Sequence, residues 1–323
     1  MNGEQPLPIC RVGELDEPDA MPRWLVETLW GHQAVGFVAG PPKLGKTWLA
    51  LDLALSVATG TPCLDTFAVP EPGGVLVYLA EDPPALVRGR LAGLCQHRGL
   101  GLDAVPLHVI TAPSLRLDLE RDQLRLRKAV ATIAPRLLVL DPLVRLHRRD
   151  ENHSGEVAEL LSFLRELQRG YGLAVVVVHH MRKGGHRDGG QALRGSGDFH
   201  AWTDSALYLR AGRDAIQLTA EHRAAPAPEP LGVRLCSQPD GSQTRLVLEA
   251  SPERPAPVAP LDPTLPERLV DLLGRSPRPL TRVELRTRMR VNNQRLGQAL
   301  HELEEKRALR RTAQGWQLAP PGP

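Results

Sequence analysis

Five short apolar runs divide the first 180 residues of the chain, and segments with helical spacing lie between most of them. The runs contain little but Val, Leu and Ala, which is typical of strands buried on both faces of a parallel sheet. They are residues 35–39, 75–80, 108–111, 137–140 and 173–179, and the helical segments are residues 48–58, 84–99, 122–133 and 154–171. Strands that alternate with helices predict an α/β domain with a mainly parallel sheet flanked by helices.

The pattern changes after residue 198, where shorter strands separated by turns follow one another. They are residues 205–210, 215–222, 232–236 and 244–249, and we expect them to be antiparallel and to extend the same sheet. Five prolines then fall within residues 251–263, which predicts an extended spacer. The expected organisation is an N-terminal extension (1–21), the α/β domain (22–250), the spacer (251–263) and a second domain (264–323).

The second domain begins with three segments of helical spacing and ends with a short hairpin. The helices are expected at residues 264–274, 281–289 and 292–306, and the strands near Leu309 and at residues 316–318. This order predicts a small winged helix, a variant of the helix-turn-helix.

The junction between the first strand and the first helix carries the motif GPPKLGKT, which fits the pattern GxxxxGK[ST]. In such a loop the backbone N–H groups and the helix N-terminus face the phosphates of a nucleotide. We expect Lys46 to reach the β and γ phosphates and Thr47 to coordinate Mg²⁺, so ATP and Mg²⁺ are the expected cofactors. The predicted nucleotide-binding residues are Gly40, Pro41, Pro42, Lys43, Leu44, Gly45, Lys46, Thr47 and the adjoining Trp48.

Polar side chains follow three further strands, at the edge of the sheet where open α/β folds bind ligands. Asp141 closes the strand at 137–140 in the manner of a Walker B motif, and we expect it to hold the magnesium ion through its water shell. Glu81 and Asp82 follow the strand at 75–80, and one of them can act as general base. His179 and His180 end the strand at 173–179 and place an imidazole near the γ-phosphate.

Composition excludes several other classes of protein. A chain of 323 residues with 42% apolar residues can bury a full core, and a net charge of +3 implies no global polyanion partner. The four cysteines show no metal-ligand spacing and no disulfide framework, so the cytoplasm is the expected compartment. No apolar run approaches the roughly 18 residues of a membrane helix, and neither a membrane partner nor secretion is expected.

Two segments after strand ends, RLHRRDENHSG (145–155) and RKGGHRDGGQALRGSG (182–197), are basic and rich in glycine. They have almost no bulky apolar side chains, so they are expected to be surface loops that contact a phosphate backbone electrostatically. The expected contacts are Arg148, Arg149, Arg182, Lys183, Arg187 and Arg194. Two ordinary solvated loops are the alternative.

These motifs together resemble the RecA-like ATPases, in particular hexameric helicases of the DnaB type and the plasmid RepA-type replicative helicases. The resemblance covers residues 22–249 and rests on GPPKLGKT, VYLAED, LLVLD, VVVVHH and LRGSGDFHAWTDSALYLR. It implies that Glu81 is the catalytic carboxylate and that His180 senses the γ-phosphate. It also implies a hexameric ring of identical subunits with single-stranded DNA in a central channel, where residues 145–155 and 182–197 form the channel loops, and a replication initiator or a primase as protein partner.

The same resemblance calls for an arginine from the neighbouring subunit at the phosphates. DnaB-type proteins carry Lys-x-Arg on a late strand, and this chain has Glu221, His222 and Arg223 there. RepA-type helicases instead carry an arginine where Asp204 stands. Arg223 is the first choice for this catalytic role, ahead of Arg194 and Arg210.

The C-terminal domain is the most basic part of the chain. Residues 264–318 hold eleven Arg and one Lys against six acidic residues, which favours DNA as its ligand. Its third helix would be the recognition helix, with Arg295 among the groups suited to base edges or phosphates. Docking on a protein is the alternative.

Three functions fit these observations. The first is a ring-forming replicative helicase of a plasmid, phage or other mobile element. The second is an ATP-dependent DNA-binding regulator, and the third is a RecA-like recombination or clock-type ATPase that assembles without unwinding.

Overall fold

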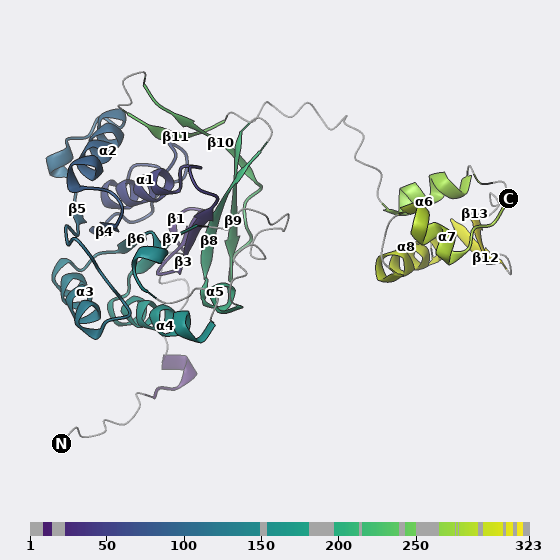
Figure 1. Ribbon diagram of the computed structural model, residues 1–323, viewed down its shortest axis with the longest axis horizontal. Coiled ribbons are helices and arrows are strands. Elements are labelled where there is room, and N and C mark those ends of the chain that lie inside the picture. The colour runs from purple at the N-terminus through teal and green to yellow at the C-terminus, as the bar shows by residue number, and fades with distance from the viewer. Residues whose placement is uncertain are drawn as a thin grey trace. The chain divides into compact units, whose positions relative to one another are not determined.

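The computed structural model describes residues 9–14, 23–148, 154–180, 197–212, 215–238 and 243–249, and near the C-terminus 265–274, 276, 278–289, 293–305, 308–312 and 315–318. The chain divides into two compact units, Met1–Ser251 and Pro252–Pro323. The larger unit is a sheet with helices on both faces, and the smaller one is mainly helical (Figure 1).

One sheet of nine strands forms the centre of the larger unit, in the order β11-β10-β9-β8-β3-β7-β6-β4-β5. Neighbouring strands are parallel from β5 to β8 and antiparallel from β8 to β11. The predicted mainly parallel α/β sheet is therefore confirmed. The strands are β3 (Val35–Gly40), β4 (Val75–Leu79), β5 (Leu107–Val109), β6 (Leu137–Asp141), β7 (Ala174–His180), β8 (Ser205–Ala211), β9 (Ile216–His222), β10 (Leu231–Cys236) and β11 (Arg245–Leu248).

The prediction that every strand after residue 198 is antiparallel was wrong for β8. This strand lies parallel to β3, with Ser205 opposite Gly36, and only its other edge pairs antiparallel, with β9. The segment between β7 and β8 contains a helix, α5 (Gly197–Trp202), that the strand pattern did not show. The segment is long enough to return the chain to the amino edge of the sheet, which a parallel neighbour requires.

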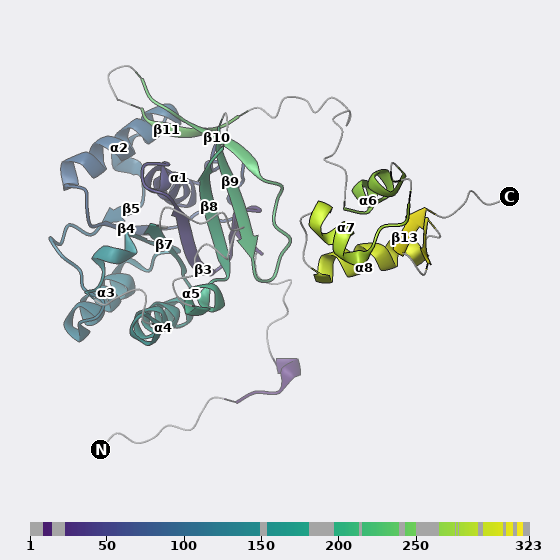
Figure 2. The same ribbon diagram turned by 45° about the vertical axis from the view of Figure 1, so that its right-hand side comes forward.

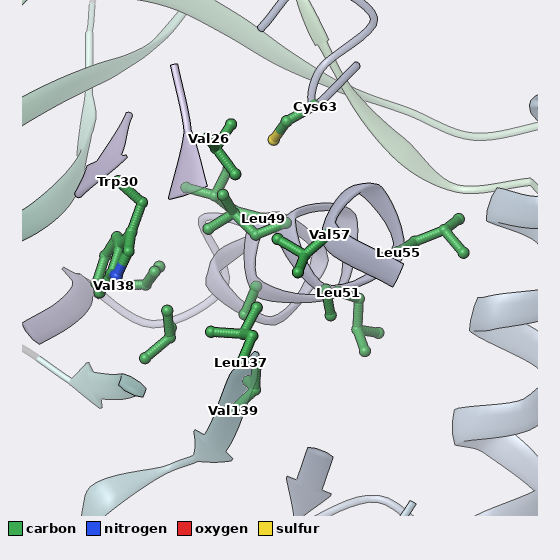
Figure 3. Close-up of a cluster of buried hydrophobic side chains, with 14 of the residues drawn as sticks. Val26, Trp30, Val38, Leu49, Leu51, Leu55, Val57, Cys63, Leu137 and Val139 are labelled. Atoms are coloured by element: carbon green, nitrogen blue, oxygen red, sulfur yellow. The ribbon is translucent and has the colours of Figure 1, made fainter. Parts of the chain in front are cut away.

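Helices cover both faces of the sheet (Figures 1 and 2). The helices α1 (Lys46–Thr59) and α2 (Pro84–His97) lie on one face, and α3 (Glu120–Ile133), α4 (Ser154–Tyr171) and α5 lie on the other. Side chains of each strand alternate between two cores: Val38 packs beneath α1, and Phe37 packs beneath α4 and α5. Figure 3 shows the first core, where Leu49 and Val57 of α1 meet Leu137 and Val139 of β6. Burial on both faces explains the nearly continuous apolar runs.

Short elements complete the larger unit. The strands β1 (Trp24–Val26) and β2 (Trp30–Gly31) pair with each other. Short 3₁₀ helices are η1 (Val12–Glu14), η3 (Leu102–Ala104) and η4 (Leu143–Arg145). Trp30 is fully buried and donates its indole N–H to the Ala34 carbonyl oxygen at 3.2 Å. The sequence did not predict β1 and β2, because a strand of two or three residues is too short to show an alternation of apolar and polar side chains.

The smaller unit has a core of its own. Its helices are α6 (Leu265–Gly274), α7 (Arg282–Met289) and α8 (Asn293–Glu305), followed by the antiparallel pair β12 (Leu309–Thr312) and β13 (Gly315–Leu318). Leucines from all three helices, such as Leu269, Leu285 and Leu300, meet there. These elements follow the predicted order, and the assignment as a winged helix stays a prediction. Within the described parts of both units, no helix combines the length and apolarity needed to cross a bilayer.

Candidate nucleotide-binding site

The phosphate loop connects β3 to α1 and needs glycine at two positions. A Cβ on Gly40 would lie 2.4 Å from the Leu209 carbonyl oxygen of β8. Gly45 adopts the left-handed conformation (φ 85°) at the N-cap of α1, where a side chain would be strained and would also meet Leu246 of β11. The loop therefore turns sharply into a helix N-terminus, which favours the binding of an anion.

Lys46 lies inside this loop, and its side chain is nearly inaccessible to solvent. Its Nζ donates a hydrogen bond to the Pro41 carbonyl oxygen at 2.8 Å. Burial lowers the pKa of Lys46, while the nearby carboxylate of Asp141 works in the opposite direction. The ammonium group is thus held within the loop, at the position expected for a phosphate ligand.

Asp141 ends β6 beside the same loop and is almost completely buried. Burial raises the pKa of Asp141 from about 3.8 to about 6, and the charges of Asp82 and Glu81 add to this shift. A hydrogen bond from Thr47 and the charge of Lys46 lower it. The carboxylate of Asp141 is therefore adjacent to the first two residues of α1.

A hydroxyl oxygen and a carboxylate oxygen in direct contact fit a magnesium ion, which prefers hard oxygen ligands. In the described part of the chain, no group of three or more His, Cys, Asp or Glu side chains is placed to hold a metal ion. Magnesium usually binds one or two carboxylates and takes its other ligands from water and phosphate. Thr47 and Asp141 are thus the residues that would hold it.

Two further carboxylates reach this rim from β4. Leu79 pairs with Asp141 in the sheet, and Ala80 N–H donates to the Asp141 carbonyl oxygen at 2.7 Å, so Glu81 and Asp82 follow immediately. Glu81 accepts a hydrogen bond from Arg145 at 2.8 Å. The predicted general base and the predicted metal ligand therefore lie on neighbouring strand ends.

Arg90 of α2 and Arg145 of η4 are two cations at this rim that the sequence did not assign to the nucleotide site, although Arg145 begins the predicted DNA-contacting segment 145–155. Arg90 forms an ion pair with Asp82, and its guanidinium lies over the ring of Trp48 at 5.3 Å. Asp82, one of the two possible general bases, is thus held by Arg90 close to Trp48, the residue that follows the phosphate loop. No motif marks these arginines, because only the fold brings them to the carboxylates.

The two histidines at the end of β7 have different surroundings. His179 is buried and its ring contacts Phe37 and Phe199, at centroid distances of 5.9 and 5.2 Å. His180 is exposed and lies opposite Gly40, the first residue of the phosphate loop, in the β3–β7 register. The preference for His180 as the residue near the γ-phosphate is consistent with this placement.

Arg223 lies at the other end of the strands from the phosphate loop, near the residue where β3 begins. It pairs with Asp204 at 3.1 Å, and Asp204 also binds Arg165 and accepts from the Val35 N–H at the start of β3. β3 is six residues long, so about 17 Å separate this cluster from the phosphate loop of the same chain. Arg210 follows on β8 and is partly buried.

Most of the expected DNA contacts fall outside the described residues, namely Arg149, Arg182, Lys183, Arg187 and Arg194. Arg148 is exposed, and its backbone N–H donates to Asp118 at 3.3 Å. Arg295 lies in α8, but its side chain is not among the described ones.

The family model described as an AAA domain matches residues 4–186, which is more than half of the chain. The chain belongs to the AAA-domain family. This AAA-domain chain is similar to two solved structures at 14% identity each. The first, "ATPase Domain of G40P", has a TM-score of 0.52 and covers 68% of this chain and 86% of its own. The second, "The Structure Of A DnaB-Like Replicative Helicase And Its Interactions With Primase", has a TM-score of 0.51 and covers 67% of this chain and 57% of its own.

The likeness confirms the fold expected from the motifs, an α/β ATPase domain with a mainly parallel sheet flanked by helices. The chain spans little more than half of the second structure's length. Family, fold and phosphate loop together identify the chain as a P-loop ATPase.

Proposed function

We propose that this chain is an ATP-driven motor that moves along single-stranded DNA, and that it serves as a replicative helicase of a plasmid, phage or other mobile element. The observation that carries the proposal is the arrangement at the carboxyl edge of the sheet. The hydrogen-bonded pair of Thr47 and the buried Asp141 lies near Glu81, and Glu81 is paired with Arg145, where the first cationic segment begins. A hydrolytic centre and a nucleic-acid contact therefore share one rim.

The residues of the site have separate tasks in hydrolysis. The loop N–H groups and Lys46 would bind the phosphates, and Thr47 and Asp141 would hold a magnesium ion, which would neutralise phosphate charge. Glu81 orients the attacking water and accepts its proton, and His180 contacts the γ-phosphate. Arg90 keeps Asp82 in place next to Trp48.

The position of Arg223 supports a ring of identical subunits. Because about 17 Å of β3 separates this residue from its own phosphate loop, Arg223 can complete only the site of another copy. Contacts in which one end of a subunit meets the opposite end of the next are heterologous. They form a ring when the rotation between subunits closes, and a helical filament when it does not. Six subunits, as the DnaB resemblance implies, is the number we propose.

The first test compares the wild type with Lys46→Ala. We expect the wild-type rate of ATP hydrolysis to rise several-fold with single-stranded oligonucleotide, the variant to be inactive, and a forked duplex to be unwound. Electron microscopy with a non-hydrolysable nucleotide should show closed rings. A hydrolysis rate indifferent to single- and double-stranded DNA would contradict the proposal.

The smaller unit supports a second candidate, an ATP-dependent regulator that binds a specific duplex. Helix α7 contains Arg282, Arg286 and Arg288, and strand β12 of the hairpin contains Arg310. Footprinting of one defined sequence without strand separation would favour this function. Filaments in place of rings would instead indicate a recombination-type assembly.

A further inference from the structure

One ion pair connects the proposed general base to the first cationic segment. Arg145, the last residue of η4, donates its Nε–H to Oε1 of Glu81 at 2.8 Å. The side chain of Arg145 is 59% exposed and that of Glu81 is 46% exposed. Arg145 is also the first residue of segment 145–155, the proposed DNA-contacting loop.

The backbone that carries Arg145 is fixed, although its side chain reaches into solvent. Leu117 N–H donates to the Leu146 carbonyl oxygen at 2.7 Å, and the Arg116 guanidinium donates to the His147 carbonyl oxygen at 2.9 Å. These bonds hold the segment after η4 against the loop that precedes α3. The side chain of Arg145 can therefore exchange partners without a movement of the chain.

A DNA phosphate is a suitable competitor for this side chain. Water screens both charges of an exposed ion pair, so the pair is weak. A guanidinium binds a phosphate through two parallel N–H···O bonds, which are stronger than its single bond to Glu81. A strand that contacts the exposed Arg145 and Arg148 at the described start of this segment brings such phosphates to Arg145.

We propose that Arg145 is a positioning residue that occupies Glu81 until a strand phosphate displaces it, so that DNA binding releases the general base. The inference rests on the function proposed above. In the step concerned, the water oxygen bonds to the γ-phosphorus and the bond from that phosphorus to the β–γ bridging oxygen breaks. The water proton passes to the Glu81 carboxylate and then to solvent, which leaves ADP and phosphate. While Arg145 holds Oε1, that carboxylate oxygen is occupied and cannot accept a hydrogen bond from the attacking water in the same direction.

The test measures ATP hydrolysis by the full-length chain without DNA and at saturating single-stranded oligonucleotide. We expect Arg145→Gln to raise the DNA-free rate several-fold, towards the stimulated wild-type rate, so that the stimulation by DNA nearly disappears. Arg145→Lys, which can still pair with Glu81, should keep most of the stimulation. The rate is recorded against oligonucleotide concentration, which separates weaker DNA binding from a change in the maximal rate.

A matched control is Arg127→Gln, because Arg127 pairs with Glu166 at 3.1 Å with side chains 38% and 61% exposed. This variant should keep both the DNA-free rate and the stimulation of the wild type. A DNA-free rate of Arg145→Gln that stays at or below the wild-type rate, with stimulation intact, overturns the inference. If the wild type does not hydrolyse ATP, or Glu81→Gln hydrolyses it as fast as the wild type, the proposed function itself fails and the inference falls with it.

Discussion

Asp141 shows at the scale of one residue how a ligand site costs stability. Its carboxylate is buried at the end of β6, and burial is the main cause that raises its pKa to about 6. Between about pH 4 and pH 6 the folded state therefore binds more protons than the unfolded state. The free energy of unfolding should fall as the pH rises through this window, because the charged carboxylate is poorly solvated.

Asp141→Asn removes this titration. Without nucleotide or metal, we expect the free energy of unfolding of the variant to rise relative to that of the wild type between pH 4.5 and pH 7. The expected gain is about 2 kcal/mol, because this window covers most but not all of a pKa shift of roughly two units. Urea unfolding at a series of pH values measures the difference. Parallel stability curves for the two proteins would show that Asp141 titrates normally.

Gly36 illustrates a second effect of single residues, the close approach of two strands. A Cβ at Gly36 would lie 1.7 Å from the Ser205 carbonyl oxygen, so β3 and β8 would have to separate. We expect Gly36→Ala to lower the free energy of unfolding by about 3 kcal/mol or more.

Gly89 of α2 provides the matched control, because it is exposed and a Cβ added there would have no neighbouring atom within 4 Å. Gly89→Ala should raise the free energy of unfolding by about 0.5–1 kcal/mol, since alanine favours the helix. Urea unfolding measures both variants, and equal effects of the two substitutions would refute the proposed clash.

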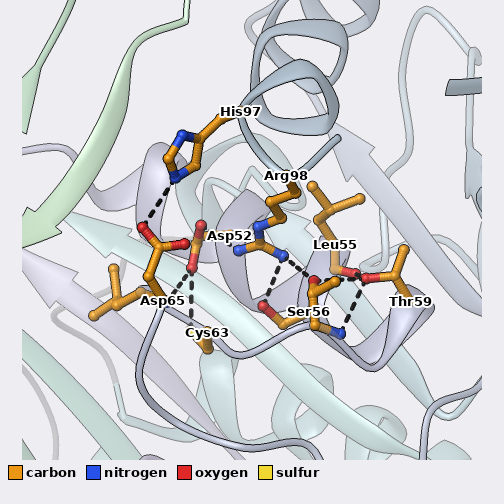
Figure 4. Close-up of polar contacts among 10 residues, drawn as sticks. Asp52, Leu55, Ser56, Thr59, Cys63, Asp65, His97 and Arg98 are labelled. Atoms are coloured by element: carbon orange, nitrogen blue, oxygen red, sulfur yellow. Dashed lines mark hydrogen bonds and ion pairs between the residues drawn. The ribbon is translucent and has the colours of Figure 1, made fainter. Parts of the chain in front are cut away.

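At the scale of elements, a buried ion pair ties α1 to the end of α2 (Figure 4). Arg98 donates to Asp52 at 2.6 Å, and its other nitrogen donates to Ser56 and Thr61. The second oxygen of Asp52 accepts from the Leu64 N–H and from the thiol of Cys63, which stays protonated because burial raises its pKa. Since α1 begins with Lys46 and α2 follows Asp82, the pair joins the two sides of the nucleotide site.

Arg98→Met leaves the Asp52 carboxylate buried without its cation. We expect the free energy of unfolding of the larger unit to fall by about 3–5 kcal/mol in urea. Asp65→Asn is the control, because Asp65 pairs with His97 at 2.9 Å in a partly exposed position, and it should cost less than about 1 kcal/mol. A loss of similar size in both variants would mean that burial of the Asp52–Arg98 pair is unimportant.

At the scale of the whole molecule, the phosphate loop lies where β3 ends, and Arg223 lies near the residue where β3 begins. In the proposed ring, each site then combines the loop of one subunit with the arginine of the next. Loss of Arg223 need not disturb the fold, because Asp204 keeps its bond to Arg165.

Lys46→Ala and Arg223→Ala should each be inactive alone, and mixed rings should regain part of the wild-type ATPase rate. In such rings some interfaces pair an intact Lys46 with an intact Arg223. The rate is measured after the two variants are mixed and allowed to reassemble with nucleotide. A mixture no more active than its components would place the essential arginine elsewhere or exclude a shared site.

The sequence alone determined the α/β class, the phosphate loop and the carboxylates at the strand ends. These features depend on local periods and on residues adjacent in the chain, such as Gly45 to Thr47 and Leu140 to Asp141. The boundaries of α4 and the order of elements in the smaller unit were readable for the same reason.

The tertiary structure decided which distant residues meet. Arg145 and Glu81 are 64 residues apart and Arg98 and Asp52 are 46 apart, so no spacing rule connects either pair. The parallel pairing of β8 with β3 and the far-edge position of Arg223 were likewise set by the path of the chain. Charge pairs and strand neighbours depend on where the sheet brings each segment, because these interactions act through space over a few ångströms and carry no fixed distance along the sequence.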